Sequence, residues 1–241
     1  MKTRVLSACA FVAALSTAAF VTAEPSVVYN DAVNDVASGI YNPSGILDLA
    51  SMEVSNDATD ITFKLTINGS GFSPDWGKYM IGIATGNGNG TTSGNGWNRP
   101  ISMSAYGGMT HWIGSWVDSG GGAQLWTHNN GWSETAATYS SGFGAFSISG
   151  NTVTYKVSMQ SLGLGYGSVF AFDAYSSGGG GSDAAIDALG NNNPSTAPGD
   201  WSTPYVSTNS GVFLYTVQLV PAPGAVALVG MAGLIARRRK A

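Results

Sequence analysis

The stretch Ile61-Thr62-Phe63-Lys64-Leu65-Thr66-Ile67 decides the fold class. Its apolar residues alternate strictly with polar ones, which is the period-two pattern of a β-strand that buries one face. The turn-forming residues Asn68-Gly69-Ser70-Gly71 follow directly and predict the end of the strand.

Outward from this stretch, other segments of the central region repeat the order of strand and turn. Tyr79, Ile81 and Ile83 alternate with other residues before a glycine-rich loop at 86–90, and residues 146–149 and 152–157 flank a two-residue Gly150-Asn151 turn. Segments 169–175 and 212–219 are rich in aromatic and β-branched residues. No long helical pattern occurs between residues 24 and 219. We therefore expect an all-β domain over 24–219, folded as a single antiparallel, jelly-roll-like β-sandwich.

The first 23 residues are predicted to be a secretory signal peptide with a short signal helix. Lys2 and Arg4 precede an apolar run over 5–21, and the run closes on Val21-Thr22-Ala23 with small residues at the positions that a signal peptidase reads. We expect the export machinery to recognise this segment and signal peptidase to cut after Ala23. Cys9 is the only cysteine and lies in this segment, so the exported part has no disulfide.

Residues 220–241 form a second predicted signal with three parts. The pair Pro221 and Pro223 makes an extended hinge. The apolar stretch 225–236 spans roughly 18 Å as a helix, which is shorter than the roughly 30 Å hydrocarbon core of a bilayer. The basic residues behind it would stay on the cytoplasmic side. The parts are Val220-Pro221-Ala222-Pro223-Gly224, the apolar stretch, and Arg237, Arg238, Arg239 and Lys240.

This tail resembles the PEP-CTERM sorting signal in its Val-Pro-Ala-Pro-Gly form, with Ala222 in place of the central Glu of the namesake motif. The resemblance implies a short apolar C-terminal helix that anchors the protein transiently in the membrane. It also implies cleavage by an exosortase-type membrane protease, after which the protein lies at the cell surface or outside the cell. A simple tail anchor is the alternative.

Charge excludes one class of partner. Between the two signals lie four basic residues and all 14 acidic ones, which gives a net charge of −10. Binding to nucleic acid needs clustered Lys and Arg, so we expect no nucleic-acid partner. The glycines at 86–90 do not lead into a helix, so they do not predict a phosphate cradle.

The central region also resembles a family. Segments 48–57, 60–65 and 76–83 are similar to the opening strands of family 9 carbohydrate-binding-like (DOMON-like) β-sandwiches, and segments 173–176 and 183–189 are similar to their later part. The resemblance implies a β-sandwich that binds sugars, haem or another small ligand.

Tryptophans provide the candidate binding site, because five of the seven fall between positions 97 and 132. Strand alternation in 111–117 places Trp112 and Trp116 on one face with Gly114 between them, which leaves a gap where a sugar ring could stack. Gln124 and His128 lie nearby in the sequence and could bind hydroxyls. The alternative is that the indoles fill the core. The candidate ligand-binding residues are Trp97, Arg99, Trp112, Trp116, Asp118, Trp126 and Trp132.

Acidic residues give two further hypotheses. Asp173, Asp183 and Asp187 could supply oxygens to one Ca²⁺. The alternative is that they are solvated acids in loops. We expect no other cofactor. Glu53, Asp57 and Asp60 could be read as a glycosidase pair, but their position at strand ends favours surface acids.

The sequence therefore predicts a protein that is not an enzyme and binds carbohydrate, such as extracellular polysaccharide, at the cell surface or in the matrix. A structural or adhesive envelope protein without a small ligand is the first alternative. A glycan-active enzyme is the second.

Overall fold

The stretch at 61–67 lies in strand β3 (Asp60–Ile67), and its four apolar side chains are fully buried in the computed structural model. β3 pairs antiparallel with β2 (Leu49–Asn56) and with β10 (Thr152–Ser158). The Asp57 carboxylate accepts hydrogen bonds from the amides of Thr59 and Asp60, both at 2.8 Å, and so stabilises the turn from β2 into β3.

A five-stranded sheet grows from these strands in the order β1-β2-β3-β10-β9, with β1 at Ser26–Asn30 and β9 at Ala145–Ser149. The predicted hairpin at 150–151 is confirmed, because β9 and β10 pair across it and Gly150 adopts a φ of +59°. A positive φ at this turn position suits glycine, which has no Cβ to clash.

The second sheet has seven strands, and all its pairings are antiparallel. Its order is β12-β11-β4-β6-β7-β8, and β14 also pairs with β11. The bounds are β4 Lys78–Ala84, β6 His111–Trp116, β7 Gly122–His128, β8 Trp132–Ala137, β11 Val169–Ser177, β12 Asp187–Ala188 and β14 Phe213–Thr216.

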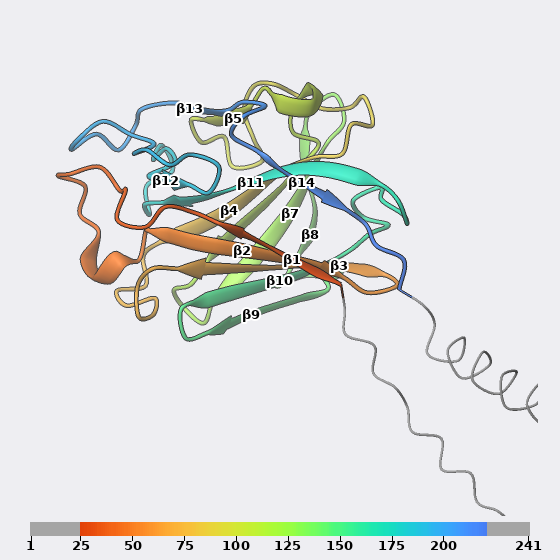
Figure 1. The fold of residues 1–241 in the computed structure, drawn as a ribbon, viewed down its shortest axis with the longest axis horizontal. Helices are drawn as coiled ribbons and strands as arrows, with labels where there is room; N and C mark the ends of the chain where they lie inside the picture. The colour runs from red at the N-terminus through yellow and green to blue at the C-terminus, as the bar shows by residue number, and fades with distance from the viewer. Residues whose placement is uncertain (1–24, 221–241) are drawn as a thin grey trace, which may run out of the picture. The chain divides into compact units, whose positions relative to one another are not determined.

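The two sheets share one hydrophobic core, and Figure 1 shows their strands as two layers. Phe63 of the five-stranded sheet meets Phe170 and Phe172 of the other edge-on, with ring centroids 6.1 Å apart in both pairs. Burying each such side chain contributes roughly 1.5–3 kcal/mol. The main core residues are Met52, Val54, Ile61, Phe63, Leu65, Ile67, Tyr79, Ile81, Ile83, Ile113, Leu125, Val153, Tyr155, Val157, Phe170 and Phe172.

A second core lies on the other face of the seven-stranded sheet, and the sequence analysis did not predict it. Met80, Trp112 and Tyr175 point away from the first core and pack against Ile101 and Met103 of β5 (Ile101–Met103). β5 pairs parallel with β13 (Tyr205–Ser207) in a two-stranded sheet, which appears above β11 in Figure 1. The all-β class with antiparallel main sheets is thus confirmed, and a covering layer is added to it.

The structure describes residues 25–220, which belong to one compact unit. The only helical elements in this range are two short 3₁₀ turns, η1 (Pro43–Gly45) and η2 (Ala105–Gly107). Within it, no helix is long and apolar enough to cross a membrane. The predicted signal helix and apolar tail helix, with Ala23 and every processing residue except Val220, lie outside the described residues.

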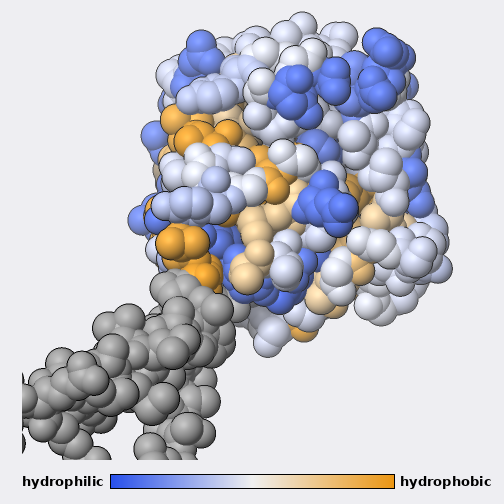
Figure 2. Space-filling view, turned by 90° about the vertical axis from the view of Figure 1, so that its right-hand side faces the viewer, coloured by the Kyte–Doolittle hydropathy of each residue, from blue (hydrophilic) through white to orange (hydrophobic). Residues whose placement is uncertain are grey.

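The surface of the domain is mixed in polarity. On the face shown in Figure 2, apolar regions are separated from one another by hydrophilic residues. Exposed apolar side chains include Val27 and Val28 on the edge strand β1 and Leu214 on β14. Aromatic side chains with large exposed fractions are Tyr41, Tyr139 and Tyr166.

Candidate functional site

The predicted placement of Trp112, Gly114 and Trp116 on one face of a strand is confirmed, and this face is the outer one of the seven-stranded sheet. Ile113, the alternate residue, lies in the core between the two main sheets. Opposite them on β7 lie Trp126, Gln124 and Gly122, respectively. The outer face of β6 and β7 therefore carries three indoles around two glycines and one glutamine.

The gap at Gly114 is not open to a ligand, because Trp97 of the same chain fills it. A Cβ placed on Gly114 would lie 2.3 Å from Cε2 of the Trp97 indole, so the ring rests directly on the glycine backbone. Trp112 is fully buried beside it and stacks on Tyr175, with centroids 5.8 Å apart. The prediction that Trp112 contacts a ligand is wrong, because the layer containing β5 covers it.

On this outer face, Gln124 forms hydrogen bonds with aromatic side chains that remain partly exposed. Its Oε1 accepts hydrogen bonds from Nε1 of Trp97 at 2.6 Å and of Trp126 at 3.3 Å. Its Nε2 donates to Glu134 Oε2 and to the Tyr139 hydroxyl, both at 2.6 Å, and that hydroxyl donates to Glu134 Oε2 at 2.7 Å. Tyr139 is 63% exposed and stacks on Trp116, with centroids 6.3 Å apart. We call Trp97, Trp116, Gln124, Trp126, Glu134 and Tyr139 the Gln124 cluster.

The other predicted ligand residues take different positions. Arg99 is buried, lies 5.5 Å from the centroid of the Trp97 ring, and donates to Ser177 Oγ at 2.7 Å. It therefore supports Trp97 from within the protein, and the prediction that it binds ligand hydroxyls is wrong. Asp118 forms an ion pair with Lys78 at 3.3 Å.

Trp132 and His128 lie at the far end of β7 and β8, where their rings meet edge-on at 5.3 Å. Nδ1 of His128 lies 2.7 Å from the Asn89 carbonyl oxygen. Trp132 is half-buried, and its indole nitrogen is shielded from solvent without a hydrogen-bond partner. These two residues are next to the Gln124 cluster along the strands but are not bonded to it.

A second aromatic group was not predicted from the sequence. Tyr41 stacks on Trp76 with an angle of 17° between the rings, and Trp76 meets Trp201 edge-on at 6.1 Å. The three residues are far apart in the chain and no strand pattern links them. Tyr41 is 67% exposed, whereas the two indoles are half-buried against the main core.

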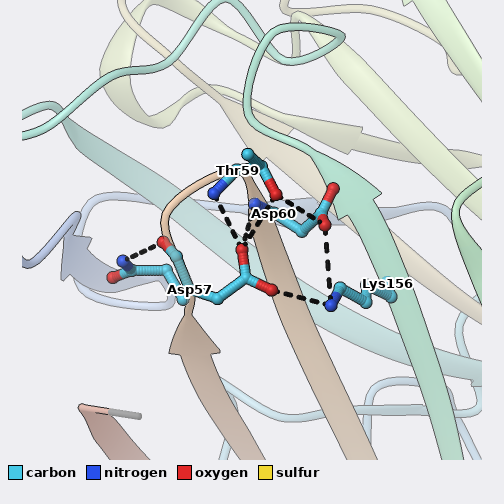
Figure 3. Close-up of polar contacts among 5 residues, drawn as sticks. Asp57, Thr59, Asp60 and Lys156 are labelled. Carbon is cyan, nitrogen blue, oxygen red and sulfur yellow. Dashed lines mark hydrogen bonds and ion pairs between the residues drawn. The ribbon is translucent and has the colours of Figure 1, made fainter. Parts of the chain in front are cut away.

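The carboxylates considered as a glycosidase pair form ion pairs with lysines on the five-stranded sheet, and Figure 3 shows those of Asp57 and Asp60 with Lys156. Asp57 and Asp60 face Lys156 Nζ at 2.7 and 3.5 Å, and Glu53 faces Lys64 at 3.4 Å. Burial alone would raise the pKa of Asp57, but the hydrogen bonds from Lys156, Thr59 and the Asp60 amide lower it to about 2. A general acid needs the opposite shift, so the Asp57 carboxyl is not suited to that role. Asp57 stabilises the turn, and Asp57 and Asp60 share the ion pair with Lys156.

The three aspartates predicted to hold calcium are not brought together. Both oxygens of Asp173 already accept hydrogen bonds, from the amides of Ala174 and Gly190 and from Ser207 Oγ. Asp183 lies in the turn at 178–183 and accepts a bond from the Gly180 amide at 2.8 Å. Of the three, Asp187 alone lies in a group of acids whose oxygens are close enough to share a metal ion.

That group is the acid cluster, which we define as Asp31, Asp35, Asp48 and Asp187. One oxygen each of Asp35, Asp48 and Asp187 lies within 4.8 Å of the others, and this is the only such group of three or more in residues 25–220. Burial raises the pKa of Asp31 to about 9, with further contributions from Asp187 and Asp35. Burial likewise raises the pKa of Asp187 well above its usual value. Sequence analysis missed three of the four members.

No family model matches this chain, and neither a curated protein nor a solved structure matches it significantly.

Proposed function

We propose that this chain is an exported, non-catalytic surface or matrix protein whose central domain binds polysaccharide through the Gln124 cluster. The observation that carries the proposal is a group of four aromatic rings on one outer face of the seven-stranded sheet. Gln124 is hydrogen-bonded to Trp97, Trp126 and Tyr139, and Trp116 stacks on Tyr139. The domain that presents them is, in this proposal, a jelly-roll-like β-sandwich with an added covering layer.

The chemistry of the cluster suits a sugar. Aromatic faces offer flat apolar area for the C–H face of a pyranose ring, and Tyr and Trp add polar tips. Tyr139 is mostly exposed and lies over Trp116, so its free face is available for stacking. Glu134 is exposed beside it and still has acceptor positions for sugar hydroxyls.

Pre-organisation also favours binding. The hydrogen bonds that Gln124 accepts from Trp97 and Trp126 and donates to Tyr139 fix three of the four rings before any ligand arrives, so little side-chain freedom remains to be lost on association. The Arg99 guanidinium holds the Trp97 ring from the buried side. A rigid, half-exposed aromatic face is therefore maintained by Gln124 within it and by the buried Arg99 behind it.

Catalysis has less support. A glycan-active enzyme would need two carboxyl groups converging beside the exposed aromatic rings. The acid cluster is next to β12, and three strands, β11, β4 and β6, separate β12 from β7 in the sheet order. Glu53, Asp57 and Asp60 belong to the other sheet and form ion pairs there.

The structural or adhesive envelope protein is the second candidate, and one observation favours it. Trp112 is fully buried and Trp97 closes the gap at Gly114, so two of the five predicted tryptophans serve packing. In that function the whole Gln124 cluster would have the same task, and the domain would bind no small sugar.

Export and sorting complete the proposal. Residues 1–23 direct secretion, and the Val220-Pro221-Ala222-Pro223-Gly224 motif with its apolar stretch and basic end holds the protein in the membrane until an exosortase-type protease cuts it. Mass spectrometry of the native protein tests this part. A mature chain that still carries Arg237 to Lys240 would contradict the processing.

Binding is tested by pull-down of the full chain with insoluble polysaccharides and with the producing cell's own matrix. The full chain carries apolar stretches at both ends, so it is handled in detergent. This detergent must have a polyoxyethylene head group, because the sugar head groups of maltosides and glucosides would compete for an aromatic sugar site. The variants are Tyr139→Ala and Trp116→Ala, and the matched control is Tyr166→Ala, since Tyr166 is 70% exposed and lies outside the cluster.

We expect the wild type and the Tyr166→Ala variant to bind one polysaccharide equally. Loss of the Tyr139 ring should weaken binding about three- to tenfold, because a stacked aromatic contact contributes roughly 0.5–1.5 kcal/mol. Circular dichroism checks that each variant is folded. Binding that both cluster variants retain in full would disprove the proposed site, and no binding across the panel would favour the envelope protein.

A further inference from the structure

The acid cluster lies beside an edge strand of each main sheet, β1 of the five-stranded sheet and β12 of the seven-stranded sheet. Asp31 follows β1, Asp35 lies in the next turn, and Asp48 precedes β2, so three members flank strands of the five-stranded sheet. Asp187 is the first residue of β12 in the seven-stranded sheet, and its Oδ2 accepts a hydrogen bond from the Leu49 amide at 2.7 Å. The cluster therefore bridges the two sheets.

Several of its oxygens have no partner. Both oxygens of Asp35 and Oδ2 of Asp31 are shielded from solvent and accept no hydrogen bond from another residue. Asp187 is fully buried and Asp48 nearly so. Buried polar atoms are almost always hydrogen-bonded, so two unpaired oxygens of Asp35 beside the buried Asp48 and Asp187 carboxyl groups indicate a place for a positively charged ligand.

The protein itself supplies no such charge. Residues 25–220 contain four basic side chains, and Lys64, Lys78 and Lys156 pair with Glu53, Asp118 and the Asp57–Asp60 pair. Arg99, the fourth, donates to Ser177, Gly178 and Asp183. None of the ion pairs in this part of the chain involves a member of the acid cluster.

We propose that the acid cluster is a calcium site that joins the two main sheets. Ca²⁺ takes six to eight oxygen ligands in a flexible arrangement, which the carboxylates of Asp35, Asp48 and Asp187 supplemented by water can provide. Mg²⁺ binds less well in such a site, because it demands regular octahedral geometry and usually keeps its waters. The hydrogen bonds from the Asn34 amide to both Asp48 oxygens, at 3.1 and 2.9 Å, fix one ligand before the ion binds.

Binding of the cation would remove the unfavourable electrostatic free energy of the clustered carboxylates in the metal-free fold. Without it the carboxylates of Asp35, Asp48 and Asp187 lie close together and shielded from water, which is unfavourable for negative charge. With Ca²⁺ bound, the segment between β1 and β2 is fastened to β12. The ion thus stabilises the fold and acts independently of polysaccharide binding.

The test titrates Ca²⁺ into the chelator-treated full chain at pH 7.5, by calorimetry and by thermal unfolding, with Mg²⁺ in a parallel series. We expect one Ca²⁺ per chain and a rise in Tm of roughly 5–10 °C at a hundredfold excess over the dissociation constant. Absence of both heat and Tm shift would overturn the proposal, as would an equal response to Mg²⁺.

Two variants locate the site. Asp35→Asn removes a charge but no hydrogen bond, so the metal-free variant should be at least as stable as the metal-free wild type and should lose most of the Ca²⁺ response. Asp183→Asn, the matched control outside the cluster, should behave like the wild type. A full Ca²⁺ response in Asp35→Asn, or its loss in Asp183→Asn alone, would show that calcium binds elsewhere.

Discussion

Gly114→Ala tests most sharply how the outer face of the seven-stranded sheet is built. The Cβ of alanine would lie 2.3, 2.4 and 2.8 Å from Cε2, Cζ2 and Cδ2 of Trp97, which is far inside contact distance. The indole has to move, because Gly114 lies in the middle of β6 and is held by pairing with β4 and β7 on either side. Moving it breaks the 2.6 Å hydrogen bond from Trp97 Nε1 to Gln124.

The magnitude follows from three contributions. Overpacking a tight contact costs about 1–3 kcal/mol, and losing a part-buried hydrogen bond costs about 1 kcal/mol. Alanine is favoured over glycine in a strand by about 0.5–1 kcal/mol, which offsets part of this loss. We expect a net destabilisation of about 2 kcal/mol and a Tm lower by about 4–8 °C for a domain of this size.

Thermal unfolding followed by circular dichroism, together with tryptophan emission, is the assay. Gly165→Ala is the matched control, because Gly165 is exposed, has no neighbour within 4 Å of an added Cβ, and has no positive φ. The control should stay within about 0.5 kcal/mol of the wild type. A Gly114→Ala variant as stable as this control, with unchanged emission, would refute the packing of Trp97 on Gly114.

Two further predictions concern charge. Since hydrogen bonds lower the pKa of Asp57 to about 2, its ion pair with Lys156 stabilises the fold above pH 4, and this stabilisation is lost as the pH falls toward 2. Lys156→Met should therefore be less stable than the wild type at pH 6, and the difference in urea unfolding should shrink on acidification. A difference in stability that does not change with pH would contradict this. Arg99→Lys should destabilise the domain by about 1–3 kcal/mol, because a single ammonium group cannot reproduce the contacts of both guanidinium nitrogens with Ser177, Asp183 and Gly178. An unchanged urea midpoint would contradict this structural role of Arg99.

Local alternation carried most of what the sequence predicted correctly. The pattern at 61–67 identifies both the strand and its buried face, and the same rule places Trp112 and Trp116 on one side of β6. Periodicity is a property of neighbouring residues, so it survives without knowledge of the rest of the fold. It does not say what covers the outer face, and that is why Trp112 was misplaced among ligand residues.

The acid cluster shows the complementary limit. Asp187 lies close to Asp35 and Asp48 only because β12 and the β1–β2 segment meet across the two sheets. Such long-range pairing leaves no local spacing to recognise. The glycine-rich run at 178–183 instead predicted Asp183 as a calcium ligand, but its carboxylate accepts a hydrogen bond from the Gly180 amide within the turn.

Hydroxyl-radical footprinting of the full chain with and without a bound polysaccharide is the measurement that tests polysaccharide binding by the Gln124 cluster most directly. Mass spectrometry reports the oxidation of each aromatic residue, and the exposed Tyr166 serves as the internal reference. We predict that polysaccharide protects Tyr139 and Trp116 and leaves Tyr41, Trp76 and Tyr166 unchanged. Protection at Tyr41 and Trp76 alone, or no protection at Tyr139 when polysaccharide is bound, would contradict the proposed site.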